Sequence, residues 1–290
     1  MNTRAHLALM VLLATLAGCA TVPSPAERTQ HADALAQAHG WVAEDLDAGR
    51  FVLRSYHPRQ GGAGGVLTVY LEGDGLAWLS PTLPSPDPTP LTPLALQLAL
   101  AQPDGSAAYL ARPCQFVGTR HCTTQDWTGA RFAPDVVTGT SHAVDRLKAR
   151  LGARELVLVG YSGGATIALL VAARREDVRQ VITVAGNLDP DAWADWHRVP
   201  RLADSDNPAR HHDELRALPQ VHLVGGRDPV TPAELAQRFQ AANPAGTPSQ
   251  LIEMPGFDHG CCWAQDWPAL WKRHAYKGSP TRRRGSVAAR

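Results

Sequence analysis

The chain lacks an excess of charge of either sign. Its 290 residues contain 28 Lys and Arg against 27 Asp and Glu, so the formal net charge at pH 7 is +1. This balance gives no electrostatic reason to expect a nucleic-acid partner. The basic run Arg282-Arg283-Arg284 stands among glycines and a proline with no apolar periodicity. We therefore expect residues 277–290 to form a disordered basic tail.

The chain also begins without a hydrophobic run long enough to span a bilayer. The apolar stretch over residues 7–17 has eleven residues, whereas a transmembrane helix needs about 20. Arg4 and His6 precede the stretch, and Leu16-Ala17-Gly18-Cys19 ends it. A charged start and a short apolar core are typical of a secretory signal.

The end of that signal resembles the lipobox of bacterial lipoproteins. The resemblance implies that a signal peptide over residues 1–18 is removed and that Cys19 carries lipid, which tethers the protein by acyl chains. Ala20 at the next position is compatible with sorting to the outer membrane in Gram-negative families. We therefore expect a lipid-anchored protein of the cell envelope that faces the periplasm. The alternative is an ordinary secretory signal with a chance cysteine.

Cysteine is scarce, and its spacing does not indicate a metal site. Four cysteines follow Cys19, and none forms a C-x-x-C pair or a His/Cys pattern suited to zinc. An exported protein is permitted disulfides. Pairing Cys114 with Cys122 is the simplest arrangement, with Cys261 and Cys262 free or bridged to each other, but cross-pairing remains open. Phosphate-loop and dinucleotide fingerprints are also lacking, so no cofactor is expected.

Strand-like and helix-like segments alternate through most of the chain. This alternation predicts an α/β fold with a mostly parallel sheet and helices on both faces. A tether over residues 19–40, with a helix candidate over 31–38, is expected to precede a single domain over 41–276. The strand candidates are residues 51–56, 66–71, 107–111, 155–160, 178–185, 220–225 and 250–254. The helix candidates are residues 94–101, 135–151, 163–174, 208–217, 232–242 and 264–274.

Two stretches interrupt this alternation. Residues 81–93 carry six prolines, which exclude a helix or a central strand. This segment is expected to run extended, either on the rim of a pocket or as a stiff connector. Residues 187–207 contain Trp193, Trp196 and His197, and they form either a small cap over a site or a short surface helix.

The pattern G-x-S-x-G at Gly160-Tyr161-Ser162-Gly163-Gly164 is the strongest functional signal. It follows the apolar run over residues 156–159 and precedes a helix candidate. A sharp turn between a strand and a helix exposes a serine hydroxyl at the edge of a sheet, and small neighbours tolerate its backbone. Ser162 is therefore the candidate nucleophile, although a helix-capping serine would share part of this pattern.

A serine nucleophile needs a base and a residue that orients the base. Asp228 follows the strand candidate over residues 220–225, and His259 follows the one over 250–254. With these motifs, Gly225-Gly226-Arg227-Asp228 and Gly256-Phe257-Asp258-His259, the chain resembles the α/β-hydrolase superfamily over residues 51–274. The resemblance implies an α/β-hydrolase fold, with Ser162 as nucleophile, His259 as general base and then acid, and Asp228 orienting His259.

Other residues compete for these roles. Asp189 follows the preceding strand candidate, where some hydrolases place the acid, so it is the alternative to Asp228. Asp258 adjoins His259 and is interpreted as loop structure. The remaining histidines that we considered have no such context and are interpreted as surface or packing residues: His121, His142, His211 and His212.

The oxyanion hole is expected to combine two backbone amides. One belongs to Gly163, directly after the nucleophile, and the other to the loop Glu72-Gly73-Asp74-Gly75. The resemblance favours the N–H of Asp74, with Gly75 as the alternative. Many family members carry His-Gly where this chain has Glu72-Gly73. We expect the Asp74 side chain to turn away and hold the loop, with a metal role as a weaker alternative.

The substrate is only broadly indicated. Trp78, Trp127 and Trp263 fall on loops expected to converge above the strand ends, which favours an acyl, aryl or sugar group, although packing alone also explains each tryptophan. We therefore expect hydrolysis of a small-molecule carboxylic ester through an acyl-enzyme. Thioester, amide or peptide bonds use the same residues. The alternative is a non-catalytic envelope lipoprotein that binds a lipid or a cell-wall fragment. The oligomeric state is not indicated.

Overall fold

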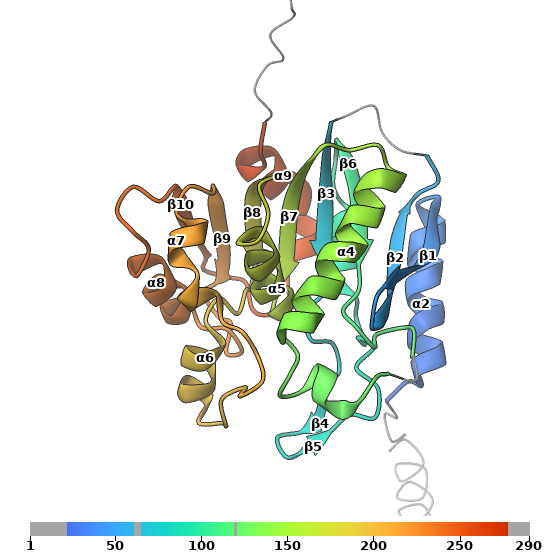
Figure 1. Ribbon diagram of the computed structural model, residues 1–290, viewed down its shortest axis with the longest axis horizontal. Helices are drawn as coiled ribbons and strands as arrows, with labels where there is room; N and C mark the ends of the chain where they lie inside the picture. The colour runs from blue at the N-terminus through green and yellow to red at the C-terminus, as the bar shows by residue number, and fades with distance from the viewer. Residues whose placement is uncertain (1–21, 61–64, 119–120, 278–290) are drawn as a thin grey trace, which may run out of the picture.

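A twisted sheet forms the centre of the molecule (Figure 1). The structure is a computed structural model that describes residues 22–60, 65–118 and 121–277. The strands of this sheet are β1 (Trp41–Ala48), β2 (Phe51–Pro58), β3 (Val66–Leu71), β6 (Ser106–Leu110), β7 (Glu155–Tyr161), β8 (Val178–Val184), β9 (Gln220–Gly225) and β10 (Ser249–Met254). Their spatial order is β1-β2-β6-β3-β7-β8-β9-β10.

The strands from β6 to β10 along this order are all parallel to their neighbours. Strands β1 and β2 complete one edge through antiparallel pairs. From β3 the chain first passes to β6 on one side, and then crosses to β7 and continues outward through β8, β9 and β10. Such a reversal opens a crevice outside the carboxyl ends of the central strands, where ligands bind in open α/β sheets.

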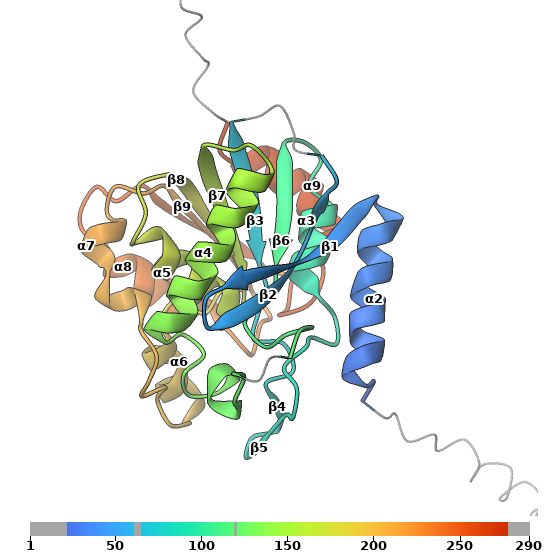
Figure 2. The same cartoon turned by 45° about the vertical axis from the view of Figure 1, so that its right-hand side comes forward.

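Helices cover both faces of the sheet (Figures 1 and 2). The helices are α2 (Pro25–Ala38), α3 (Leu94–Leu100), α4 (Pro134–Arg150), α5 (Gly163–Ala172), α6 (Pro190–His197), α7 (His212–Leu215), α8 (Ala233–Ala241) and α9 (Trp263–His274). Apolar residues of α4, α5 and α8 pack in one core, and those of α2, α3 and α9 pack in the other. Every residue of α5 is buried. The predicted α/β class with a mostly parallel sheet is thus confirmed.

The tether expected over residues 19–40 is wrong for residues 25–30, which belong to α2, whereas the helix candidate over residues 31–38 is confirmed as part of α2. Ser24 Oγ accepts the Glu27 amide at 3.3 Å, while Glu27 Oε2 accepts the Ser24 amide at 2.7 Å. This reciprocal capping box starts the helix six residues earlier than expected. Arg28 is buried, pairs with Asp87 at 3.3 Å and donates to the carbonyl of Thr89. Helix α2 is therefore anchored to the proline-rich segment.

Two other elements differ from the predictions. Strand β1 was not expected, because its sequence carries three acidic residues and it has only one partner strand, β2. The single helix expected over residues 208–217 is instead a short turn, η2 (Pro208–Arg210), followed by α7. Asn207 accepts the Ala209 amide at 2.9 Å, and Leu215 is the one residue of α7 that is buried, so little apolar burial supports a longer helix here.

The structure pairs the four described cysteines as Cys114–Cys122 and Cys261–Cys262. The first bridge joins Cα atoms 5.8 Å apart in the loop after β6. The signal peptide over residues 1–18, the lipidation candidate Cys19 and residues 278–290 of the expected tail lie outside the described residues. In the described part of the chain, no helix has the length and apolar character needed to cross a membrane.

Candidate active site

Ser162 occupies the turn between β7 and α5. Its backbone has φ 52° and ψ −121°, a conformation that is costly for a residue with a side chain. The turn is tight enough that a Cβ added at Gly160 would overlap the carbonyl oxygen of Gly164. A Cβ at Gly164 would in turn overlap the carbonyl oxygen of Leu71 on β3. The small residues of the G-x-S-x-G pattern are therefore required by close backbone packing, and they expose the hydroxyl at the carboxyl end of the sheet.

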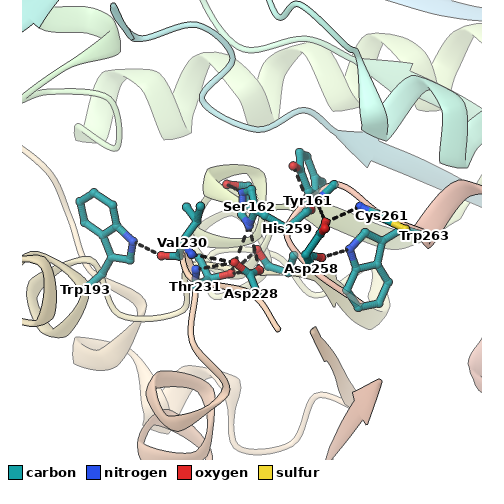
Figure 3. A network of polar contacts seen from close by, with 12 residues as sticks. Tyr161, Ser162, Trp193, Asp228, Val230, Thr231, Asp258, His259, Cys261 and Trp263 are labelled. Atoms are coloured by element: carbon teal, nitrogen blue, oxygen red, sulfur yellow. Dashed lines mark hydrogen bonds and ion pairs between the residues drawn. The ribbon is translucent and has the colours of Figure 1, made fainter. Parts of the chain in front are cut away.

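The structure brings Ser162, His259 and Asp228 together in one hydrogen-bonded row (Figure 3). His259 Nε2 lies 3.0 Å from Ser162 Oγ, and His259 Nδ1 lies 2.8 Å from Asp228 Oδ2. The three residues are more than 30 positions apart from one another, and each follows a different strand. Parallel strands place all of their carboxyl ends at one edge, which is why residues distant in sequence meet here.

Asp228 is held as an anion at the bottom of this row. It is 5% exposed, and Oδ1 accepts the amides of Val230 at 2.8 Å and Thr231 at 2.9 Å. Oδ2 accepts the Thr231 hydroxyl at 2.8 Å as well as His259. Burial opposes ionisation, but the hydrogen bonds from His259 and Thr231 outweigh it and lower the pKa of Asp228. A buried carboxylate that stays ionised can fix the tautomer of the imidazole.

The loop that carries His259 is braced by its own neighbours. Asp258 Oδ1 accepts the amides of Gly260 at 2.9 Å and Cys261 at 2.7 Å, so Asp258 acts within the loop and not on His259. Trp263 Nε1 donates to the carbonyl of Asp258 at 2.9 Å, and the Tyr161 hydroxyl donates to the carbonyl of His259 at 3.2 Å (Figure 3). These contacts orient the imidazole toward Ser162.

Asp189 is placed away from this row. Its Oδ1 accepts the amides of Asp191 and Ala192, both at 3.1 Å, and the side chain of Asn207 at 2.7 Å. It therefore caps α6, and the structure brings Asp228 and not Asp189 to His259. The other histidines also lie elsewhere. His211 pairs with Asp206, His212 contacts Asn243, and His121 and His142 are exposed.

The three amides expected in the oxyanion hole are available at the same place. The N–H groups of Gly163, Asp74 and Gly75 donate to no described residue, whereas the Gly73 N–H donates to Glu72 Oε1 at 2.9 Å. A Cβ at Gly73 would come within 3.2 Å of Ser162 Cβ, so the loop passes close to the nucleophile just before Asp74. Gly75 has φ +63° and turns the chain against the carbonyl of Pro88. Asp74 is the first residue after this close approach whose N–H donates to no described residue, and its role as the second donor stays a prediction.

The Asp74 side chain was expected to turn away from the site, and this prediction is wrong. The position of a Cβ on Gly163 would overlap Asp74 Oδ1, so the carboxylate lies directly beside the nucleophile turn. Arg112 Nη1 lies 3.1 Å from Asp74 Oδ1, and Arg131 Nε lies 3.2 Å from Oδ2. Two guanidinium groups thus neutralise a carboxylate that would otherwise repel a developing oxyanion. Among the described residues, no cluster of three or more His, Cys, Asp or Glu side chains is arranged for a metal ion.

Glu72 lies under the same loop and is 1% exposed. Its Oε1 accepts the amides of Gly73 at 2.9 Å and Ala95 at 3.4 Å, so it joins the oxyanion loop to the start of α3. Burial raises the pKa of Glu72 to about 7, although these hydrogen bonds act in the opposite direction. Glu72 is therefore partly protonated near neutral pH.

A cavity of about 420 Å³ opens above Ser162. Trp78, Leu91 and Trp193 line it, so the proline-rich segment lies on its rim and α6 lies at its side as a cap. Trp127 and Trp263 do not line it. Trp127 donates to the carbonyl of Ser85 at 3.1 Å, and Trp263 is fully buried, so both belong to the scaffold. The other residues that line the cavity include Glu72, Asp74, Leu76, Arg131, Thr231 and His259.

Arg112 and Arg131 are the functional residues that sequence reasoning missed. Neither arginine belongs to a sequence motif, and both lie in the segment between β6 and α4. Their meeting with Asp74 is a long-range contact, 38 positions away for Arg112. The spacing of the two arginines along the sequence gives no signal for their contact with Asp74.

Comparisons with known proteins agree with this architecture. A family described as alpha/beta hydrolase fold matches residues 133–210. Est1E from Butyrivibrio proteoclasticus superposes with a TM-score of 0.54 at 13% identity, over 81% of this chain and 98% of that one. An esterase from Pyrococcus furiosus gives a TM-score of 0.56 at 14% identity, over 82% of this chain and 90% of that one.

An acylaminoacyl peptidase from Pyrococcus horikoshii gives a TM-score of 0.58 at 9% identity. The alignment covers 83% of this chain but 42% of the peptidase. No curated protein sequence matches the chain. At these identities the solved structures establish the architecture and not the substrate. The chain has the α/β-hydrolase fold.

Proposed function

We propose that the protein is a serine hydrolase that cleaves a carboxylic ester through an acyl-enzyme on Ser162. The observation that carries the proposal is the row from Ser162 Oγ through His259 to Asp228, with spacings of 3.0 and 2.8 Å, at the bottom of a cavity. Both distances lie within the reach that proton transfer requires. The esterase and peptidase names of the superposed structures are consistent with this reaction class.

In the first half-reaction Ser162 Oγ attacks the carbonyl carbon while His259 Nε2 takes the hydroxyl proton. The oxygen of the tetrahedral intermediate becomes an anion, and the amides of Gly163 and Asp74 donate to it. When the intermediate collapses, the bond to the alcohol breaks and His259 returns the proton to the departing oxygen. Asp228 stabilises the imidazolium that exists between these two transfers.

In the second half-reaction water takes the place of the alcohol. His259 removes a proton from the water as it attacks the acyl carbon, and then donates that proton to Ser162 Oγ. The acid leaves, and the enzyme returns to its starting state. Thioesters, amides and peptides share these steps, and the apolar side chains of Trp78, Leu76 and Leu91 in the cavity support an acyl or aryl group.

A fluorophosphonate probe tests the nucleophile directly, because it labels only an activated serine. We expect wild-type protein to be labelled and Ser162→Ala to remain unlabelled, with a mass shift mapped to the peptide that contains Ser162. A panel of para-nitrophenyl esters of increasing chain length then defines the acyl preference. Folded wild-type protein that resists the probe and hydrolyses none of the panel would favour the non-catalytic binding protein instead.

We also propose that Cys19 carries the lipid anchor and that the mature protein faces the periplasm from the outer membrane. The lipobox-like segment Leu16-Ala17-Gly18-Cys19 supports this proposal. Globomycin should block processing and leave the precursor in the membrane fraction. A mature N-terminus at a position other than Cys19 would contradict the proposal without affecting the assignment of Ser162.

A further inference from the structure

Arg131 is a buried cation on the wall of the cavity that contains Ser162. The residue is 5% exposed, and Nε lies 3.2 Å from Asp74 Oδ2. No described residue accepts a hydrogen bond from its two terminal nitrogens, Nη1 and Nη2, whereas Nε is fully buried. Arg131 also lines a hollow of about 10 Å³ beside Arg112, which is too small for a ligand, so a ligand would reach the guanidinium from the larger cavity. A buried guanidinium whose fork is unused is costly unless a ligand fills it.

Arg112 provides the contrast within the same cluster. It is equally buried at 5% exposure, but Nη1 donates to Asp74 and Nη2 donates to the carbonyl of Arg131. Arg112 does not line the cavity. Its role is to hold Asp74 and the backbone of Arg131, so of the two guanidinium groups only Arg131 has donors to offer a ligand.

The charges around the cavity leave room for one more anion. Asp74 is a single carboxylate shared by two arginines. Two further acidic groups lie nearby: Asp126 is paired with Arg50 at 2.7 Å, and burial raises the pKa of Glu72 to about 7, so Glu72 is partly protonated near neutral pH. Asp228 is committed to His259 and Thr231. The formal charge of the Asp74, Arg112 and Arg131 cluster is therefore positive by one unit.

Aromatic side chains fix the position of the free fork. The guanidinium carbon of Arg131 lies 5.7 Å from the ring centre of Trp193 and 5.4 Å from that of Phe132. Trp193 is held in turn by a 2.7 Å hydrogen bond from Nε1 to the carbonyl of Val230 (Figure 3). A guanidinium presents its two terminal nitrogens in one plane, which matches a carboxylate better than the ammonium of a lysine would.

The fork also lies close to the reacting atoms. Asp74 Oδ1 touches the site of the Gly163 Cβ, and the other oxygen of the same carboxylate lies at Arg131 Nε. One carboxyl group therefore separates the oxyanion hole from Arg131. A substrate group that binds the terminal nitrogens of Arg131 must therefore be only a few bonds from the scissile carbonyl. A short acyl chain with a charged end meets this requirement.

We propose that this hydrolase is selective for esters that carry a carboxylate a few bonds from the scissile carbonyl, and that Arg131 is the residue that receives this carboxylate. The inference rests on the proposed ester hydrolysis at Ser162. Arg131 acts on binding and specificity, and no proton passes through it. The half-esters of short dicarboxylic acids are the simplest members of this substrate class.

The kinetic test compares two isosteric esters. The mono-para-nitrophenyl ester of adipic acid carries the carboxylate, and the same ester of adipic acid monoamide is neutral. We expect wild-type kcat/KM to favour the charged ester by at least about tenfold, because a charge-assisted pair is stronger than a neutral hydrogen bond. Arg131→Gln should abolish the preference, mainly through KM for the charged ester. Arg131→Lys should retain part of it.

Arg201→Gln is the matched control, because Arg201 is an exposed arginine that pairs with Asp195 on α6. It should leave both substrates unchanged. An equal loss of both activities in Arg131→Gln would show that Arg131 serves only to hold Asp74, and it would overturn the proposal. A wild-type enzyme with no preference, or with a preference for the amide, would overturn it as well.

A binding measurement separates this inference from the proposed reaction. Ser162→Ala cannot turn over the charged ester, so calorimetric titration measures its affinity directly, and Ser162→Ala with Arg131→Gln should bind it about tenfold less tightly. Normal fluorophosphonate labelling without any preference for the charged ester refutes the role of Arg131 alone. Absent labelling combined with Arg131-dependent binding of the charged ester refutes the hydrolase and leaves the carboxylate site standing.

Discussion

Two walls of one cavity are built in different ways. The triad wall consists of Ser162, Asp228 and His259, and each follows directly from the end of a strand. The ion-pair wall consists of Asp74 and Arg131, with Arg112 behind them and outside the lining of the cavity, and both arginines lie in irregular structure between β6 and α4. In the triad wall each polar atom of Asp228 is satisfied, whereas in the ion-pair wall Arg131 keeps unused donors.

Under the two proposals, this difference separates the residues of the reaction from the residues of substrate selection. A hydrogen-bonded row with no spare donors suits one invariant proton transfer. A cluster that contains a guanidinium with unused donors suits ligand recognition, because those donors form hydrogen bonds only when a ligand binds. The two walls meet at Gly163, the residue after Ser162, because a Cβ at this position would overlap Asp74 Oδ1. Substitutions of residues on either side of this contact are therefore the best way to test whether the two walls have different roles.

The largest expected effect is on the triad wall. Asp228→Asn keeps the shape of the side chain but removes the charge that fixes the tautomer of His259, so kcat/KM should fall by about 10³- to 10⁴-fold. Asp189→Asn is the matched control, because Asp189 only caps α6, and it should change kcat/KM by less than about threefold. Comparable losses in the two variants would contradict the assignment of Asp228.

The second effect tests the contact between the walls. Gly163→Ala introduces a Cβ that overlaps Asp74 Oδ1, and the two arginines prevent Asp74 from yielding freely. The oxyanion loop should shift, and kcat should fall by about 10²- to 10³-fold. In the Asp74→Ala background the same substitution has room, so its effect should become much smaller.

Gly256→Ala serves as the control for this cycle. Gly256 lies on the loop that carries His259, and an added Cβ there meets nothing within 4 Å. Activity should be retained in that variant. Additive losses for Gly163→Ala and Asp74→Ala, measured as kcat/KM in the four proteins of the cycle, would show that the two walls do not touch functionally.

The third effect is on stability and belongs to Glu72, under the ion-pair side of the cavity. Its pKa is about 7 in the folded protein against a reference value of 4.5, so the folded state holds the proton more tightly. Its contribution is fully present below pH 4.5 and is lost as the pH rises through 7. Glu72→Gln cannot ionise. Relative to wild type, its free energy of unfolding should therefore rise by up to about 3 kcal/mol between pH 4.5 and 8.

Chemical denaturation at a series of pH values measures this difference. Glu253→Gln replaces an exposed carboxylate on β10 and should show no comparable trend. A flat difference between Glu72→Gln and wild type across this range would mean that Glu72 stays ionised throughout. An ionised Glu72 would then offset the excess positive charge of the Asp74, Arg112 and Arg131 cluster, which would also weaken the expected preference for anionic esters.

The smallest effect lies outside both walls. Ser24→Ala removes the hydroxyl that caps α2, so the free energy of unfolding should fall by about 1 kcal/mol. Ester hydrolysis at temperatures well below the melting transition should be unchanged, since Ser24 is exposed and remote from Ser162. Thr29→Ala, at a half-buried position within α2 that does not cap the helix, is the matched control. A loss of activity in Ser24→Ala would show that α2 positions the proline-rich rim through Arg28.

Much of the fold and half of the site were readable from the residues. Nearly continuous apolar runs identified the parallel strands, because strands buried on both faces need apolar residues throughout. Strand β1 was not identified in this way, because it is an edge strand and its sequence contains acidic residues. Helix α2 had a readable start, since Ser24, Pro25 and Glu27 form a capping pattern, but its low apolar content gave the appearance of a tether.

The sequence by itself determined the sharp turn at Ser162 and the placement of His259 and two candidate acids, Asp189 and Asp228, after recognisable strands, because a strained turn needs small residues at fixed spacing. Only the tertiary structure decided which acid meets His259, which way Asp74 faces and that two arginines surround it. The physical reason is that charges separated by tens of residues carry no periodicity or spacing constraint along the chain. Their pairing is set by where the strand order reverses and how the loops above it pack.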